Sequence, residues 1–212
     1  MNLRETLRRM DPTRQAIWLV LIWLLLASVL WVWWDERSLP DLRGSWASAG
    51  CEEVKSAGGV SRVKRSMEVD ETQWRLTVDF YGEEGCTNEL FSVETEGPYD
   101  LGPKSMGLRG ATTVRFDLDK VTLTPRAAET ADAFDAAGCA AGGWKVGEGQ
   151  EVSQLGCLGI FPTRSTCPTE YDVVKIAGDA LYLGDRSRGL CTPERYPARF
   201  APAPLLRVDD AS

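Results

Sequence analysis

Residues 73–80, Gln-Trp-Arg-Leu-Thr-Val-Asp-Phe, alternate polar and apolar side chains without a break. Successive residues of a β-strand point to opposite faces, so Trp74, Leu76, Val78 and Phe80 share one face and the polar residues share the other. This alternation is typical of a half-buried antiparallel strand. The stretch therefore predicts a sheet with one apolar face.

The segments on both sides repeat this alternation. Residues 63–69 place Val63, Met67 and Val69 on one face, with Arg65 unusually among them, and Asp70-Glu71-Thr72 predicts the turn into the next strand. A shift of phase indicates a bulge or tight turn near Asp119-Lys120. The apolar residues that we expect to share the inner face with those of 73–80 are Met67, Phe91, Val93, Val114, Phe116 and Leu118.

Further strands are expected over 144–146, 151–153 and 158–161, with a last hairpin over 171–184. One helix is expected over 126–137, capped by Thr124, with Pro125 in its first position and Gly138 at its end. Short strands at even spacing favour an antiparallel barrel or a sandwich. We favour a mainly β fold with one partly open, lipocalin-like barrel, a short helix and disulfides.

All six cysteines fall after residue 50, and an even number in an exported domain predicts three disulfides. Cys51 and Cys86 flank the first hairpin, Cys139 and Cys157 are equidistant from Glu148, and Cys167 and Cys191 flank the turn at Gly178-Asp179 almost symmetrically. These positions favour the pairs 51–86, 139–157 and 167–191. A zinc site is the alternative, although no close Cys-x-x-Cys pair supports it.

Residues 16–34 carry no charge over 19 positions, and as a helix they would rise about 28 Å, close to the thickness of a bilayer core. Arg4, Arg8, Arg9 and Arg14 precede them and Asp35-Glu36 follow, which predicts a cytoplasmic N-terminus. We expect a single-pass signal anchor in contact with the lipid bilayer. A cleaved signal peptide is the alternative.

The expected organisation is a cytoplasmic N-terminus (1–15), a transmembrane helix (16–34), a linker (35–43), a β-barrel domain outside the cytoplasm (44–191) and a proline-rich tail (192–212). The net charge of −7 makes nucleic acid an unsuitable partner. No histidine is present, so the commonest general base and zinc ligand are missing.

The sequence contains no nucleophile elbow, phosphate loop, dinucleotide fingerprint or metal motif, and we expect no catalytic residues, no metal and no cofactor. Acidic pairs such as Asp70-Glu71 and Asp117/Asp119 are more typical of solvated turns. Large apolar side chains on one strand face either fill a barrel or leave room for a lipid-like ligand. The candidate pocket-lining residues are Met67, Trp74, Leu76, Val78, Phe80, Phe91, Val93, Val114, Phe116 and Leu118.

Several motifs occur in one order over residues 42–191. They are Leu42-Arg43-Gly44-Ser45-Trp46, Gly50-Cys51-Glu52, Val63-Lys64-Arg65, Gly85-Cys86-Thr87-Asn88, Gly138-Cys139, Gly156-Cys157 and Cys167-Pro168-Thr169-Glu170-Tyr171-Asp172. This succession resembles the repeated domain of the adenomatosis-polyposis-coli-down-regulated family of Wnt antagonists.

The resemblance implies a membrane-tethered extracellular protein with an open β-barrel that binds the acyl chain carried by Wnt. It also implies that Cys51, Cys86, Cys139, Cys157, Cys167 and Cys191 are structural, that Trp46 closes the barrel, and that Arg65 matches the family without a known role. The chain departs from the family in having a single such domain, an N-terminal anchor and no Asn-x-Ser/Thr sequon. Its Ala-, Gly- and Arg-rich composition is typical of a bacterial protein, and bacteria have no Wnt.

Two functions follow from these observations. The first is a membrane-anchored barrel that binds an acyl chain or a lipidated partner protein. The second is a tethered protein-interaction or assembly module with a packed, ligand-free barrel that docks a protein through its rim. A hydrolase without a recognisable motif is a third alternative.

Overall fold

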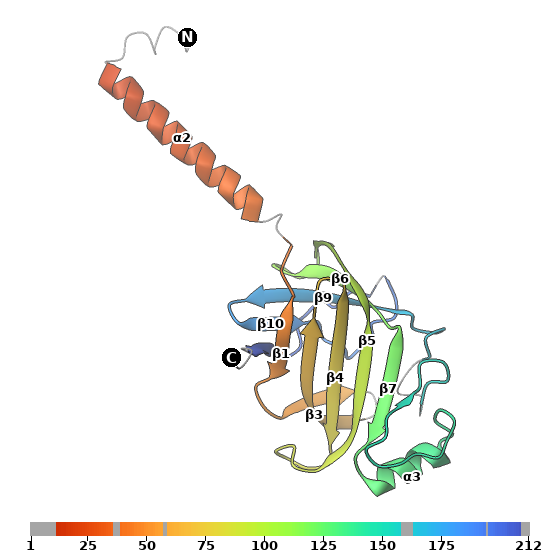
Figure 1. Ribbon diagram of the computed structural model, residues 1–212. Coiled ribbons are helices and arrows are strands. Elements are labelled where there is room, and N and C mark those ends of the chain that lie inside the picture. Colours follow the sequence, from red (N-terminus) through yellow and green to blue (C-terminus); the bar gives the residue numbers. More distant parts are fainter. Residues whose placement is uncertain (1–11, 36–38, 57–58, 158–162, 194, 209–212) are drawn as a thin grey trace. The chain divides into compact units, whose positions relative to one another are not determined.

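A computed structural model of the chain describes residues 12–35, 39–56, 59–157, 163–193 and 195–208 (Figure 1). The chain forms two compact units, residues 1–39 and residues 40–212. The first contains the helix α2 (Pro12–Asp35), and the second contains all the strands.

Helix α2 is 24 residues long, and the side chains described within it are exposed. Among the described residues, none of the helices combines the length and the apolar character that a membrane crossing requires. The membrane span expected at 16–34 thus gains no support here.

The second unit is mainly β, as predicted, and the strands described in it pair in antiparallel fashion. The described strands are β1 (Gly44–Ser48), β2 (Glu52–Ser56), β3 (Gly59–Val69), β4 (Gln73–Tyr81), β5 (Glu89–Lys104), β6 (Thr112–Asp117), β7 (Lys120–Pro125), β8 (Gln150–Glu151), β9 (Thr169–Ala177), β10 (Ala180–Leu183) and β11 (Leu205–Val208).

Eight of these strands close a ring in the order β1-β3-β4-β5-β6-β9-β10-β11, because β11 pairs with β1. The barrel is therefore closed, where the sequence predicts a partly open one. The closing strand β11 lies within 192–212, which the sequence assigns to an irregular tail, so that assignment is wrong for Leu205–Val208. Its four residues continue the sheet because Leu205 supplies a fully buried side chain to the interior.

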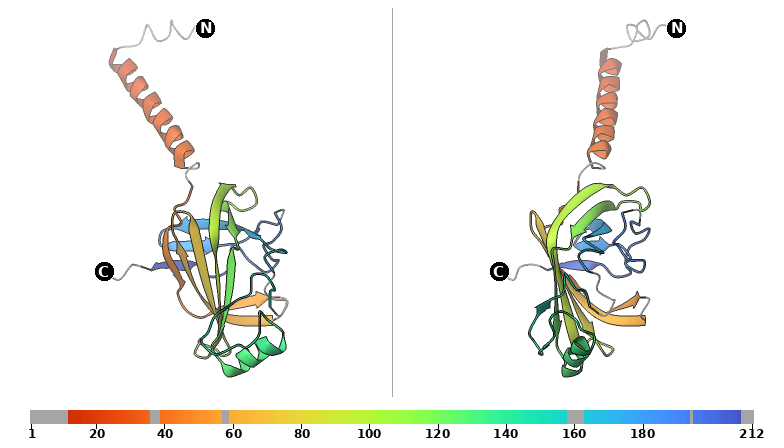
Figure 2. Two further views of the ribbon diagram at one scale, coloured as in Figure 1. Left: turned by 45° about the vertical axis from the view of Figure 1, so that its right-hand side comes forward. Right: turned by 90° about the vertical axis from the view of Figure 1, so that its right-hand side faces the viewer.

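The ring continues at one end into an open sheet, because two long strands change partners along their length. In β3, residues 66–69 pair with β1 and residues 59–63 pair with β2. In β5, residues 99–104 pair with β6 and residues 91–96 pair with β7. The six strands at this open end run in the order β2-β3-β4-β5-β7-β8. Both views of Figure 2 show the helix α3 at this end, away from the β5–β6 hairpin.

Two apolar clusters fill the inner face of this domain. The barrel core lies inside the ring and is built around Trp46, Trp74 and Phe116. The open-end core is built around Leu123, Phe134 and Trp144, and Phe80 and Phe91 pack against it. Trp74 and Leu76 of β4 belong to the barrel core and Phe80, the penultimate residue of the same strand, packs against the open-end core, so one strand face serves both clusters.

Helix α3 (Ala128–Ala136) starts later than the sequence predicts. Thr124 and Pro125 belong to the end of β7, and Ala127 stands at the N-terminus of the helix without a side-chain cap. Proline has no backbone N–H, so Pro125 can stand at the end of a strand without leaving a donor unpaired. The predicted role of Gly138 at the C-terminus is confirmed, because it follows the C-cap residue Ala137 and adopts a positive φ of 66°. Ala131 and Phe134 are the buried residues of α3.

The cysteines form the three disulfides expected from the sequence, namely Cys51–Cys86, Cys139–Cys157 and Cys167–Cys191. Residues 144–146 are not a strand, since Trp144 packs into the open-end core from a loop. Of the residues 151–153, which were expected to form a strand, only Glu151 belongs to one. It forms the short strand β8 together with Gln150, and β8 pairs with β7. The strand expected at 158–161 lies outside the described residues.

Candidate functional site

The residues expected to line a pocket do share one face of the sheet. In the register of β4 and β5, Leu76 lies opposite Thr95, Val78 opposite Val93 and Phe80 opposite Phe91. Directly opposite residues of an antiparallel pair project to the same side. The structure divides the predicted set between the two cores.

Six of the predicted lining residues lie in the closed half and are buried there: Met67, Trp74, Leu76, Val114, Phe116 and Leu118. The rings of Trp74 and Phe116 are 4.7 Å apart between centroids. A side chain that borders a space large enough for water keeps some solvent-accessible area. Met67 and Phe116 are each only 1% exposed, so neither borders such a space. These six residues pack together in the barrel core, and such packing is what the second function requires.

Trp46 lies at the end of the ring where the chain enters the barrel, and its indole N–H donates to the carbonyl of Leu42 at 2.8 Å. The Arg207 guanidinium, directly opposite in register, stands 4.2 Å from the centre of the Trp46 ring. Arg207 also donates to the carbonyl of Arg43 at 3.1 Å. An arginine over an indole face is a favourable cation–π contact, and it covers this end of the barrel.

At the open end, the inner face keeps accessible apolar surface. Phe80 and Phe91 are only half-buried against the open-end core, in which Val93 is buried, and Val78, also half-buried, borders the barrel core. The rings of Phe80 and Phe91 stack with their centroids 4.5 Å apart, and Phe91 meets Phe134 of α3 edge-on at 5.7 Å. This surface, formed by Val78, Phe80 and Phe91, is called the open-end surface below.

Arg65 points inward, as its place among apolar residues in the sequence suggested. It lies opposite Val78, and its side chain forms an ion pair with Glu52 at 2.8 Å in which both side chains are 10% exposed. Its guanidinium also donates to the carbonyl of Ala203 at 2.9 Å. The Ser48 hydroxyl accepts from the Arg65 backbone N–H at 2.8 Å and donates to Glu52. Each charge thus has a partner of opposite sign inside the sheet.

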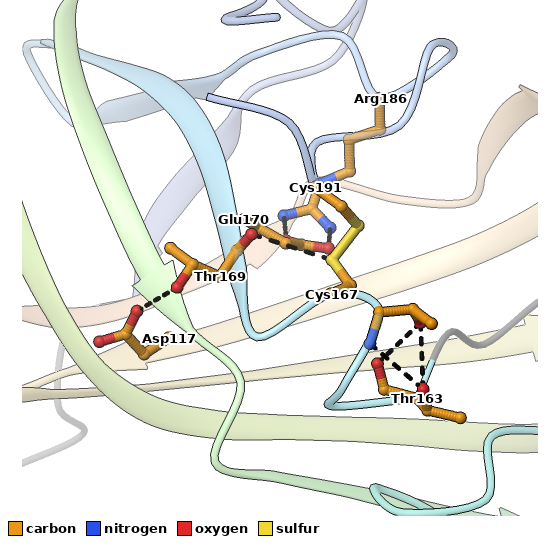
Figure 3. The surroundings of a disulfide bond; sticks show 8 residues. Asp117, Thr163, Cys167, Thr169, Glu170, Arg186 and Cys191 are labelled. Atoms are coloured by element: carbon orange, nitrogen blue, oxygen red, sulfur yellow. Dashed lines mark hydrogen bonds and ion pairs between the residues drawn. A yellow bond between two sulfur atoms is a disulfide. The ribbon is translucent and has the colours of Figure 1, made fainter. Parts of the chain in front are cut away.

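A second ionic cluster lies on the inner face of β9. Glu170 pairs with Arg186 at 2.7 Å, next to the Cys167–Cys191 disulfide (Figure 3). Asp172, fully buried, lies 3.7 Å from Arg186 and accepts from the backbone N–H groups of Val173 and Gly184. Burial raises the pKa of the Asp172 carboxyl from 3.8 to about 6, and the Arg186 charge opposes this shift.

Sequence reasoning missed Glu52, Asp172, Arg186 and Arg207. Asp172 is followed by two valines, Val173 and Val174, which point to opposite faces of the strand. The sequence therefore does not show which face is buried, nor that the Asp172 side chain points inward. Glu52 sits in a short strand rich in charge, where an inward carboxylate has no distinctive pattern. The inward Arg65 was the available signal, because a buried cation requires a buried anion.

The acidic pairs that could have served acid–base chemistry have structural partners. Asp70 caps the β3–β4 turn by accepting from the N–H groups of Thr72 and Gln73, and these bonds lower the pKa of its carboxyl. Asp117 accepts from the Thr169 hydroxyl, and Asp119 pairs with Arg164. Among the described residues, no group of three or more His, Cys, Asp or Glu side chains could hold a metal ion.

Residues 35–144 match the family described as adenomatosis polyposis coli down-regulated 1. The match covers more than half of the chain, from the linker through α3 to Trp144. The fold and the match together define the class of this protein. It is a closed antiparallel barrel from a family of Wnt-related binding proteins. The chain belongs to the adenomatosis-polyposis-coli-down-regulated family, and the resemblance seen in the sequence is confirmed. A bacterial origin is not confirmed by this match.

Proposed function

We propose that this protein binds an acyl chain, free or carried by a lipidated partner protein, against the open-end surface. The observation that carries the proposal is the contrast between the two halves of one strand face. The buried residues of the closed half are packed, whereas Phe80 and Phe91 keep accessible apolar area beside the open-end core and Val78 keeps it at the border of the barrel core. Apolar area left on an inner face is a favourable contact for a hydrocarbon chain.

Membership of the family supports this proposal, since the family is linked to Wnt and Wnt carries an acyl chain. Within it, the function would be negative regulation of Wnt signalling through capture of the lipidated protein. The acidic balance of the chain favours a basic or neutral surface on that partner.

The experiment compares two substitutions on neighbouring residues of β4. Val78→Phe adds bulk to the open-end surface, whereas Thr77→Phe places the same ring on the outer face of the strand. Titration of each full-length variant with a peptide carrying one saturated acyl chain, and with the same peptide lacking it, measures the acyl contribution. We expect Val78→Phe to weaken acyl-dependent binding by tenfold or more and Thr77→Phe to leave it unchanged. Equal effects of the two variants, or no acyl-dependent binding by the unmodified chain, would overturn the proposal.

The packed interior of the closed half favours a second candidate, a tethered interaction module without a ligand. This function needs no accessible apolar surface inside the sheet and uses the rim of the barrel to dock a protein. The same titration separates the two functions, because an interaction module binds acylated and unacylated forms of a partner equally.

We further propose that residues 16–34 anchor the domain in a membrane, with the N-terminus in the cytoplasm and the barrel outside. The uncharged stretch, the arginines before it and the three disulfides after it support this arrangement. Reporter fusions at the two ends of the chain test it. Activity of a cytoplasmic reporter fused after Ser212 would overturn the orientation.

A further inference from the structure

Two ionic clusters face each other across the inside of the ring. Arg65 lies on β3 opposite Val78, and Glu170 lies on β9 opposite Phe116; both apolar partners contact the barrel core. Strands β3 and β9 are separated by three strands in either direction around the ring. The two clusters therefore project inward from opposite walls. Together, Glu52, Arg65, Glu170, Asp172 and Arg186 are called the polar belt below.

The polar belt lies where the ring gives way to the open sheet. Arg65 stands between the part of β3 that pairs with β1 and the part that pairs with β2. Glu170 is the second residue of β9, and its neighbour Phe116 is the penultimate residue of β6, beyond which the chain leaves the ring to form β7. The packed barrel core lies on one side of the belt, and Phe80 and Phe91 lie on the other.

The belt's cations are already committed to the belt's own carboxylates. Arg65 donates two hydrogen bonds to Glu52 and a third to the carbonyl of Ala203. Arg186 contacts both Glu170 and Asp172. Committed cations are poor anchors for an incoming anionic head group. A hydrocarbon end that reached the belt would have to displace these partners or remove their remaining water, and both cost free energy.

On the basis of the function proposed above, we infer that the polar belt is a depth stop that sets the longest acyl chain the protein accepts. An acyl chain gains affinity with each methylene that covers the open-end surface, by about fourfold per group. Once its methyl end meets the belt, additional methylenes stay in water and add nothing. Arg65 and Glu52 are then specificity-determining residues for chain length.

The test is a length series of water-soluble peptides, each carrying one saturated acyl chain, titrated against the immobilised full-length chain. The double variant Glu52→Ala/Arg65→Ala removes one cluster without leaving a buried charge unpaired. Arg115→Ala/Asp100→Ala removes an ion pair of similar length, 2.7 Å, from the exposed surface, and serves as the control. If the first variant does not fold, Glu52→Leu/Arg65→Met takes its place, since it removes the charges and keeps most of the volume.

We expect the unmodified chain and the control to stop gaining affinity at the same chain length. The belt variant should continue to gain, about fourfold per methylene, for further members of the series. A plateau at the same length in all three proteins would overturn the depth stop and leave the proposed function standing. Absence of saturable acyl binding in all three would overturn both.

Discussion

Arg65 and Glu52 are each almost fully removed from water, and each depends on the other for its charge to be tolerated. Removal of one partner from a buried ion pair leaves an uncompensated charge, which is more costly than loss of the pair as a whole. We expect Arg65→Met to lower the free energy of unfolding by about 3 kcal/mol. Adding Glu52→Leu should recover most of that loss, as measured by urea unfolding followed through tryptophan fluorescence.

The matched control is Arg115→Ala, whose partner Asp100 is 67% exposed. Its effect should stay below about 1 kcal/mol, because solvent screens an exposed pair. An Arg65→Met variant as stable as this control would contradict the structural role given to the ion pair.

Asp172 predicts a specific pH dependence of stability. Its pKa is raised by burial to about 6 in the folded chain, so between pH 4 and 6 the folded state binds more protons there than the unfolded state does. The contribution of this group to stability is therefore largest at low pH and is lost as the pH rises through 6. Asp172→Asn cannot ionise and removes this dependence.

Urea unfolding of the unmodified chain and of Asp172→Asn, at several pH values between 4 and 7.5, measures the difference. We expect the variant to gain stability relative to the unmodified chain as the pH rises, by about 1–3 kcal/mol across the range. A stability difference that does not change with pH would show that Asp172 titrates normally.

At the scale of the residue, the sequence predicts the apolar residues of the interior better than it predicts the charged residues buried among them. Alternation identified Met67, Trp74, Phe80 and Phe91 as sharing a face, because apolar residues repeat with the period of a strand. It could not tell which of them would be packed and which half-buried, since that depends on where β3 and β5 change partners. The Arg186 contact with Asp172 comes from chain folding after β10 and leaves no local pattern.

At the scale of the element, strand β5 depends on a glycine at the point where its partner changes from β7 to β6. A Cβ on Gly97 would overlap the backbone carbonyl of Asp117, which cannot move like a side chain. We expect Gly97→Ala to destabilise the domain by about 3 kcal/mol or more, since backbone overlap forces the strands apart. Gly107→Ala, where a Cβ meets nothing within 4 Å, is the matched control and should change stability by less than about 0.5 kcal/mol.

Helix α3 and strand β11 show why local sequence rules reached only part of the elements. Thr124-Pro125 is a good helix start by its residue types, yet β5 needs Pro125 and Thr124 as strand partners for Phe91 and Ser92. Leu205–Val208 follows a stretch with four prolines, which indicated a tail, yet it fits between β1 and β10. In both cases a long-range pairing outweighed the local preference.

At the scale of the whole molecule, closure of the ring rests on β11, the last described strand. A chain that ends at Ala203 lacks β11 and leaves β1 and β10 without their shared partner. It also removes Leu205 from the barrel core and Arg207 from above Trp46. We expect this truncation to prevent cooperative folding, seen as loss of a sharp thermal transition in near-ultraviolet circular dichroism.

A chain that ends at Val208 keeps β11 complete and is the control for the truncation. It should melt like the full-length chain. A sharp transition in the chain that ends at Ala203 would mean that seven strands suffice for the closed half.

Closure of the ring also determines where a second polypeptide could add to this sheet. Within the described residues, β2 pairs only with β3 and β8 only with β7, so each of these two strands has a neighbouring strand on one side only. Glu53 and Lys55 place opposite charges along β2, a device that discourages self-association of such edge strands. Fibril growth or strand donation by another protein would begin at β2 or β8, because each of the eight ring strands already has a neighbouring strand on both sides.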